Sequence, residues 1–160
     1  MPWTISKPVV VPFDFSEHAM QAVKKAIELA SDSSLVNCLH VLPFITPTEP
    51  GVIWGLVDDQ ERLKHALESM QQYLPEHQFG KLHVDVRLGD PGTVVADRAK
   101  ELNAELIVVG SHGRSGLARW MLGSVAERVT RLAPCPVLVV KPQLQTVTAA
   151  KAETLQVAIA

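Results

Sequence analysis

The stretch PVVVPFDFSEHAMQAVKKAIELA, residues 8–30, decides the fold class because its hydrophobic period changes once along its length. Its first part, Pro8–Phe13, is a continuous apolar run rich in valine, which is typical of a strand buried on both faces. From Ser16 to Ala30 the apolar residues recur at steps of three and four, which predicts an amphipathic helix. A buried strand that runs into a helix predicts a β-α unit of a parallel sheet.

The same alternation continues to residue 140. Further strands are predicted at 35–42, 82–88, 105–109 and 136–140, with helices at 58–74, 90–103 and 124–132 between them. Right-handed crossovers leave few ways to arrange such units. We therefore expect a single-domain α/β fold, a doubly wound five-stranded parallel sheet with the order 3-2-1-4-5, Rossmann-like in kind.

Two segments stand apart from this pattern. Residues 43–57 form a Pro/Gly-rich stretch that is longer than a simple connection needs, so a functional role is a hypothesis for it. Residues 143–160 fit an added strand, a helix or disorder equally well. The domain is therefore expected to cover residues 1–142, followed by a C-terminal tail at 143–160.

Composition narrows the function classes. With 47% hydrophobic and 20% charged residues the chain has enough apolar material for a core, which argues against disorder. A net charge of −2 without a dense run of Lys or Arg gives no electrostatic footprint for nucleic acid. No signal peptide and no membrane-length apolar run are recognisable. Cys38 and Cys135 lie in apolar segments and are interpreted as buried, reduced thiols, a disulfide being the alternative. We expect a cytoplasmic protein that contacts neither membranes nor nucleic acid.

The expected strand order points to one place for a ligand. The first strand ends at Phe13 and Asp14, and the fourth ends at Val109 and Gly110. In open α/β sheets the crevice between the carboxyl ends of two such strands, where the strand order reverses, binds ligands.

The segment after the fourth strand, GSHGRSGLARWMLGS at 110–124, has the chemistry of a phosphate site. Glycines allow close approach of an anion, and the helix that opens at Ser124 presents N–H groups and a partial positive charge. Arg114 is positioned in sequence to add a charged contact. A structural reading competes, in which Ser124 and Glu127 form a capping box and Gly110 only turns the chain. The segment is neither a P-loop nor a dinucleotide fingerprint.

Taken together, Gly110-x2-Gly113-x9-Gly123-Ser124 resembles the glycine signature of the ATP-binding branch of the universal stress protein family. VVVPFDFS at 9–16, LHV at 39–41, LIVVGSHGR at 106–114, GSVAER at 123–128 and APCPVLVV at 133–140 resemble the rest of that family, so the likeness covers about residues 8–141. The bulky Phe13, the long 43–57 loop and the tail depart from it. Phe13 is expected to narrow the mouth of the pocket.

The resemblance implies a site and a function. Adenine would lie against Pro12, Phe13 and Val41, and Asp14 near the ribose and a Mg²⁺ ion that accompanies ATP. Ribose and phosphates would contact residues of the loop and of the helix after it, which are Gly110, His112, Gly113, Arg114, Gly123, Ser124 and Val125. Two of these residues keep a second interpretation: Asp14 as a helix N-terminal charge beside Ser16, and His112 as a solvent-facing loop residue.

The expected function is that of a stress-response protein that binds ATP, or AMP or ADP, as a dimeric binding or switch module, with a protein partner left unidentified. A slow ATPase and a nucleotide-free scaffold are the alternatives. Neither a nucleophile elbow nor metal-spaced histidines occur, so no catalytic residue is predicted. The apolar edge strand 136–140 is expected to pair with its copy in a homodimer, unless the tail covers it.

Overall fold

Five parallel strands of the described residues form one sheet in the order β3-β2-β1-β4-β5, which confirms the predicted topology. Their bounds are β1 Val9–Pro12, β2 Val36–Leu42, β3 His83–Leu88, β4 Leu106–Gly110 and β5 Val137–Val140. Each lies within one or two residues of its predicted range. The central strands β1 and β4 are almost entirely buried, as continuous apolar runs require.

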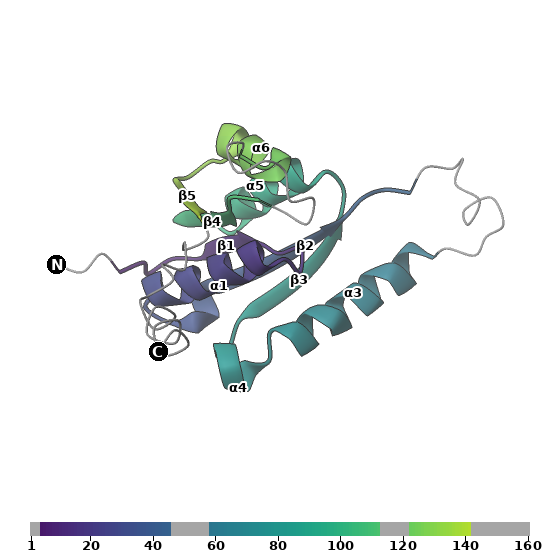
Figure 1. Ribbon diagram of the computed structural model, residues 1–160, viewed down its shortest axis with the longest axis horizontal. Coiled ribbons are helices and arrows are strands. Elements are labelled where there is room, and N and C mark those ends of the chain that lie inside the picture. Colours follow the sequence, from purple (N-terminus) through teal and green to yellow (C-terminus); the bar gives the residue numbers. More distant parts are fainter. Residues whose placement is uncertain (1–3, 46–57, 113–121, 142–160) are drawn as a thin grey trace, which may run out of the picture.

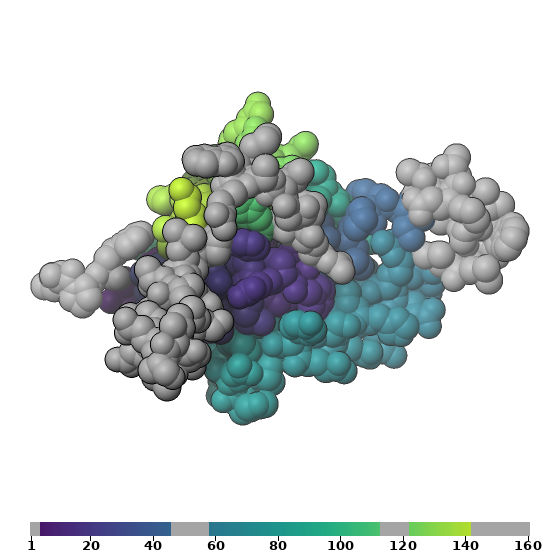
Figure 2. Space-filling view, in the orientation of Figure 1, coloured from purple at the N-terminus to yellow at the C-terminus, as the bar shows by residue number. Residues whose placement is uncertain are grey.

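The computed structural model describes residues 4–45, 58–112 and 122–141, so the tail 143–160 and most of the 43–57 segment lie outside the described residues. Helices α1 (Glu17–Leu29) and α3 (Asp59–Tyr73) cover one face of the sheet, and α5 (Pro91–Glu101) and α6 (Ser124–Leu132) cover the other (Figure 1). Side chains of α1 form the centre of the first face, with those of α3 below them (Figure 2). Helices on both faces make the sheet doubly wound.

Local capping explains where three helices begin. Ser16 Oγ accepts a hydrogen bond from Ala19 N at 3.1 Å ahead of α1. The carboxylates of Asp58 and Asp90 accept in the same way at the starts of α3 and α5. Each bond satisfies one of the N–H groups that a helix start leaves without a helical partner.

Helix α6 does not begin with the capping box that the structural interpretation of Ser124 and Glu127 predicts. Gly123 is its N-cap, Ser124 is its first helical residue, and no side chain caps the start. Glu127 N bonds to the carbonyl of Gly123 as an ordinary helical residue. The capping-box interpretation of Ser124 and Glu127 is therefore wrong, because the helix begins one residue earlier than a box with Ser124 as its N-cap would require.

The two sheet edges differ in character. On β3, Arg87 donates to both carboxylate oxygens of Glu101 on α5, each at 2.9 Å, and also bonds Asp85 at 3.1 Å. These bonds hold the pKa of Glu101 down at about 2, mainly because Arg87 donates to its carboxylate. Strand β5 has four apolar residues that are all half-buried. The charged edge protects itself against pairing, whereas the apolar edge does not.

Two short elements were missed by the sequence patterns. A 3₁₀ turn, η1 (Ser33–Leu35), precedes β2, and a one-turn helix, α4 (Glu76–Phe79), follows α3. Both are too short for a hydrophobic period to reveal them. Phe79 of α4 is buried and belongs to the same core cluster as Met70 and Leu74.

Candidate functional site

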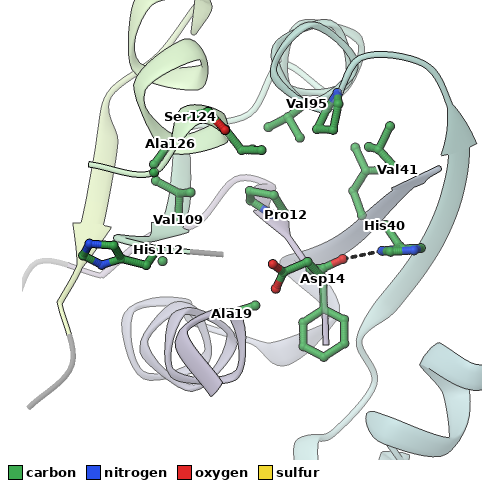
Figure 3. Close-up of a pocket in the computed structure, with 16 residues that line it drawn as sticks. Pro12, Asp14, Ala19, His40, Val41, Val95, Val109, His112, Ser124 and Ala126 are labelled. Atoms are coloured by element: carbon green, nitrogen blue, oxygen red, sulfur yellow. Dashed lines mark hydrogen bonds between the residues drawn. The ribbon is translucent and has the colours of Figure 1, made fainter. Parts of the chain in front are cut away.

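A cavity of about 290 Å³ opens at the carboxyl ends of β1, β2 and β4, where the strand order reverses (Figure 3). Strand β1 pairs with β2 on one side and with β4 on the other, and the helices that come after β1 and β4, α1 and α6, lie on opposite faces of the sheet. Helices α1, α5 and α6 supply the remaining walls. The cavity has room for part or all of one small ligand.

The structure brings together the predicted site residues that it describes. All of them line the cavity: Pro12, Phe13, Asp14, Val41, Gly110, His112, Gly123, Ser124 and Val125. Gly113 and Arg114 lie outside the described residues. The sequence patterns missed further lining residues, which are Ala19, Leu39, His40, Pro91, Val95, Val109 and Ala126. Most of these are apolar positions of helices and strands that look like any other core residue in sequence.

Asp14 stands at the end of β1 as both a structural and a cavity residue. Its Oδ1 accepts from Ser16 N at 3.1 Å and from Ser16 Oγ at 2.5 Å. The residue between them, Phe15, has a positive φ of 65°, a conformation that bulky residues rarely adopt. This turn lets Ser16 cap α1 while Asp14 lines the cavity. Asp14 thus has the contact with Ser16 that the structural interpretation expects, and it also lies in the wall of the cavity.

The N-terminus of α6 lies across the cavity from Asp14, with Ser124 as its first helical residue (Figure 3). The first helical hydrogen bond of α6 runs from Glu127 N to Gly123 O, so the N–H groups of residues 124–126 precede it. Such groups, together with the helix dipole, make a suitable place for a phosphate. Among the described lining residues there is no Lys or Arg, so the helix end is the main positive element there.

Gly110 has a packing role, which the sequence alone could not separate from a role in letting a phosphate approach the backbone. A Cβ built on it would lie 2.9 Å from the backbone carbonyl carbon and oxygen of His18 on α1. The next residue, Ser111, is buried and receives Gly123 N on its carbonyl at 2.9 Å. Its hydroxyl lies 3.0 Å from Nδ1 of His112. Gly110 thus lets α1 approach β4, and Ser111 joins the two ends of the glycine segment.

An apolar slot occupies the other half of the cavity, between β2 and the helices α5 and α6. Leu39, Val41, Val95 and Val125 belong to or pack against the same core cluster, and Pro91 begins α5 beside them. A flat heterocycle is the kind of ligand that such a slot accommodates, because burial of its faces removes apolar area from water.

The prediction that Phe13 narrows the mouth is wrong. Its side chain is only 2% exposed and belongs to the core beneath α1 and α3. The ring packs edge-on against Phe15 and Tyr73, with centroids 5.2 and 6.5 Å away. The strand alternation turns this ring to the face opposite the slot, because Pro12 precedes it on the slot side.

The donor set fits a magnesium ion that arrives with phosphates. Within the described residues no three His, Cys, Asp or Glu side chains come together as a metal site. Asp14 is the acidic side chain among the described lining residues. Mg²⁺ commonly takes one or two carboxylates and completes its shell with phosphate oxygens and water. A metal held by the protein alone would need more ligands than this.

A sequence model of the universal stress protein family matches residues 6–141. The chain belongs to the universal stress protein family. A universal stress protein of Methanocaldococcus jannaschii, MJ0531, is 36% identical over 141 residues, which cover 84% of this chain and 82% of that protein. Universal stress protein YxiE of Bacillus subtilis is 32% identical over 148 residues, covering 83% and 97% of the two chains.

Solved structures agree with this assignment. The structure of hypothetical protein MJ0577 has a TM-score of 0.70 and 28% identity, with 88% of this chain and 99% of that chain covered. A universal stress protein in complex with cAMP is 24% identical with a TM-score of 0.55 over 86% and 98% of the chains, and it shares the fold. Among the described residues of this universal stress protein, no helix has both the length and the apolar character to cross a membrane.

Proposed function

We propose that this universal stress protein binds ATP, or AMP or ADP, in the cavity between the ends of β1 and β4, and that the bound nucleotide governs a dimeric binding or switch module. The observation that carries the proposal is the arrangement of three features around one cavity. These are the α6 N-terminus with Ser124, the carboxylate of Asp14 opposite it, and the apolar slot beside Val41.

Each part of the nucleotide is assigned to one of these three features. The base enters the apolar slot between β2 and α5, the ribose lies near Asp14, and the phosphates meet the N–H groups at the start of α6. Mg²⁺ accompanies the phosphates, with Asp14 as its protein ligand, directly or through water. A neighbour of the same fold in complex with cAMP supports the idea that this architecture accommodates an adenine nucleotide.

Binding without appreciable turnover is part of the proposal. Phosphoryl transfer needs positioned water or a base and cations that neutralise the leaving phosphates. Among the described lining residues, the cavity has no Lys or Arg and one carboxylate. Phosphate release by the purified protein should therefore stay close to buffer controls. A rate above roughly 1 per second that disappears in Asp14→Asn would favour the alternative, an ATPase.

The dimer and the location complete the proposal. Strand β5 forms the apolar edge of the sheet, and pairing with a second copy about a two-fold axis would cover it. Cys38 and Cys135 are both free thiols, as is usual in the reducing cytoplasm. We therefore propose a cytoplasmic homodimer, with its protein partner unidentified.

Calorimetric titration with ATP and Mg²⁺ tests the binding. The variant Gly123→Val puts a branched side chain at the entrance of α6, where the backbone has φ −61° and ψ 148° and accepts any residue. We expect wild type to bind ATP with a dissociation constant on the order of micromolar, and this variant to lose most of that affinity while keeping its fold. Gln71→Val on the exposed side of α3 is the matched control.

Absence of both heat and thermal shift at millimolar ATP would refute the proposal and favour the nucleotide-free scaffold. The same result for Gly123→Val and Gln71→Val would refute the assignment of the phosphates to the start of α6. Circular dichroism of each variant shows that a loss of affinity is not a loss of fold.

A further inference from the structure

The ladder between β1 and β2 stops at the edge of the cavity. The strands pair in register from Val9 with Val36 to Pro12 with Leu39. One more main-chain bond follows, from Phe13 N to Leu39 O at 2.9 Å. Beyond this bond the chain leaves the sheet toward Asp14, while β2 continues to Leu42.

The alternation of β2 determines which way the main chain of Val41 faces. The carbonyl of Leu39 bonds toward β1, and the carbonyl of Leu42 accepts from Gly89, which follows β3. In a central strand alternate residues direct their N–H and C=O groups to opposite neighbours. Val41, two residues after Leu39, therefore directs both groups to the β1 side, past the point where β1 has ended. That is the side on which the cavity opens.

A continued ladder would join the N–H of Val41 to the carbonyl of Phe13. Among the described residues no main-chain bond joins these two groups. Instead, Nδ1–H of His40 donates to the Phe13 carbonyl at 2.7 Å, the contact drawn as a dashed line in Figure 3. A side chain of β2 has thus taken the acceptor that the next residue of β2 would otherwise use.

The imidazole is held in this position by its neighbours. The ring of Phe15 packs edge-on against it, with centroids 5.0 Å apart, and Tyr73 of α3 packs against Phe15 at 5.2 Å. Phe15 itself has the unusual positive φ. Such conformations persist where the surroundings determine them strongly, commonly at functional sites. The aromatic contacts orient His40 toward the carbonyl.

We propose that His40 is a specificity-determining positioning residue of the nucleotide site. By occupying the Phe13 carbonyl, it keeps the N–H and C=O of Val41 available to the edge of a nucleobase. A donor beside an acceptor matches adenine, which offers a ring-nitrogen acceptor beside an amino donor. Guanine offers the reverse pair, a carbonyl acceptor beside a ring N–H, on the same edge. The inference rests on the proposed function and adds the residue that sets base preference.

The first test uses the protein without nucleotide, so it does not depend on binding. Amide hydrogen exchange followed by NMR compares the N–H of Val41 with that of Leu39. We expect the Val41 amide to exchange fast in wild type and to slow by about tenfold in His40→Phe, because the freed Phe13 carbonyl then accepts from it. His40→Asn keeps an N–H donor at the same depth and should leave the Val41 amide fast.

The second test measures dissociation constants for ATP and GTP. These two variants separate the donor from the ring, since His40→Phe keeps the ring against Phe15 and His40→Asn keeps the donor. We expect His40→Phe to bind ATP about tenfold more weakly and to lose preference over GTP, and His40→Asn to retain that preference. His40→Leu serves as a second variant without a donor if the phenylalanine disturbs the fold.

Each outcome bears on the inference. Equal exchange of the Val41 amide in wild type and in the variants without a donor would overturn it, and so would an unchanged ratio of ATP to GTP affinity. If wild type binds neither nucleotide, the proposed function fails, but the exchange comparison still decides whether His40 holds the Val41 N–H free. If His40→Asn behaves like His40→Phe, the ring and not the donor matters, and the inference is wrong.

Discussion

Gly110→Ala should destabilise the protein because the end of β4 touches the backbone of α1. The added Cβ would lie 2.9 Å from the carbonyl carbon and oxygen of His18 and 3.0 Å from its Cβ. Non-bonded carbon atoms prefer a separation of about 3.5–4.0 Å, so α1 would have to move by roughly 0.5–1 Å.

The helix is not free to make that movement. Ala19, Ala22 and Val23 of α1 are between 0% and 4% exposed and pack on the core face of the sheet. Overpacking of this kind costs about 1–3 kcal/mol of unfolding free energy. For a chain of this size each kcal/mol lowers the melting temperature by about 2–4 °C, so we expect a loss of roughly 2–12 °C.

Thermal and urea unfolding followed by circular dichroism measures the loss, for wild type, Gly110→Ala, His18→Ala and the double variant. The closest atoms of His18 are its backbone carbonyl, so removal of the imidazole should not restore stability. An unchanged midpoint in Gly110→Ala would refute the reasoning. Full recovery in the double variant would show that the clash lies with the side chain and not with the helix backbone.

The pKa of Glu101 is lowered from 4.5 to about 2, so its carboxylate stabilises the fold above pH 4.5 and loses that effect as the pH falls toward 2. Urea titrations at several pH values should show that the unfolding free energy falls less over this pH range in Glu101→Gln than in wild type. Burial raises the pKa of Cys38 to about 12, so iodoacetamide should label the half-buried Cys135 before Cys38 in the native protein. Peptide mass spectrometry measures the order of labelling, and simultaneous labelling of both thiols would contradict this prediction. Leu138→Asp on β5 should convert the dimer to monomers in sedimentation equilibrium, and a monomeric wild type at tens of micromolar would contradict the proposed dimer.

Much of the fold could be predicted because its signals are local. The valine run of β1, the helical step of α1 and the capping groups Ser16, Asp58 and Asp90 are readable without knowing what packs on them. The helical turns η1 and α4 could not be predicted, since three or four residues are too few for a helical period to repeat. Cys135 was expected to be buried like Cys38, but it precedes the edge strand and is half-buried.

In the candidate site, too, the residues marked by local signals could be predicted and the others could not. Asp14, Gly110 and Ser124 could be selected because strand ends and helix starts gather at one edge of a parallel sheet. Val95 lines the slot as an ordinary apolar residue of a helix, so no sequence pattern marks it as part of a site. Val125 is equally ordinary in sequence and could be selected only because it follows Ser124. The orientation of Phe13 and the true cap of α6 were beyond local patterns as well, because a shift of one residue decides each.

The sequence by itself determined the order of strands and helices, the reversal point of the sheet and the residues delivered to it, because hydrophobic period and capping chemistry act within a few residues. Only the tertiary structure decided which partners those residues meet. His40 reaches the carbonyl of Phe13, 27 positions away, and Gly110 receives the backbone of His18. Contacts of this kind depend on strand register and on how closely a helix lies on the sheet, and these are set by the packing of the whole core.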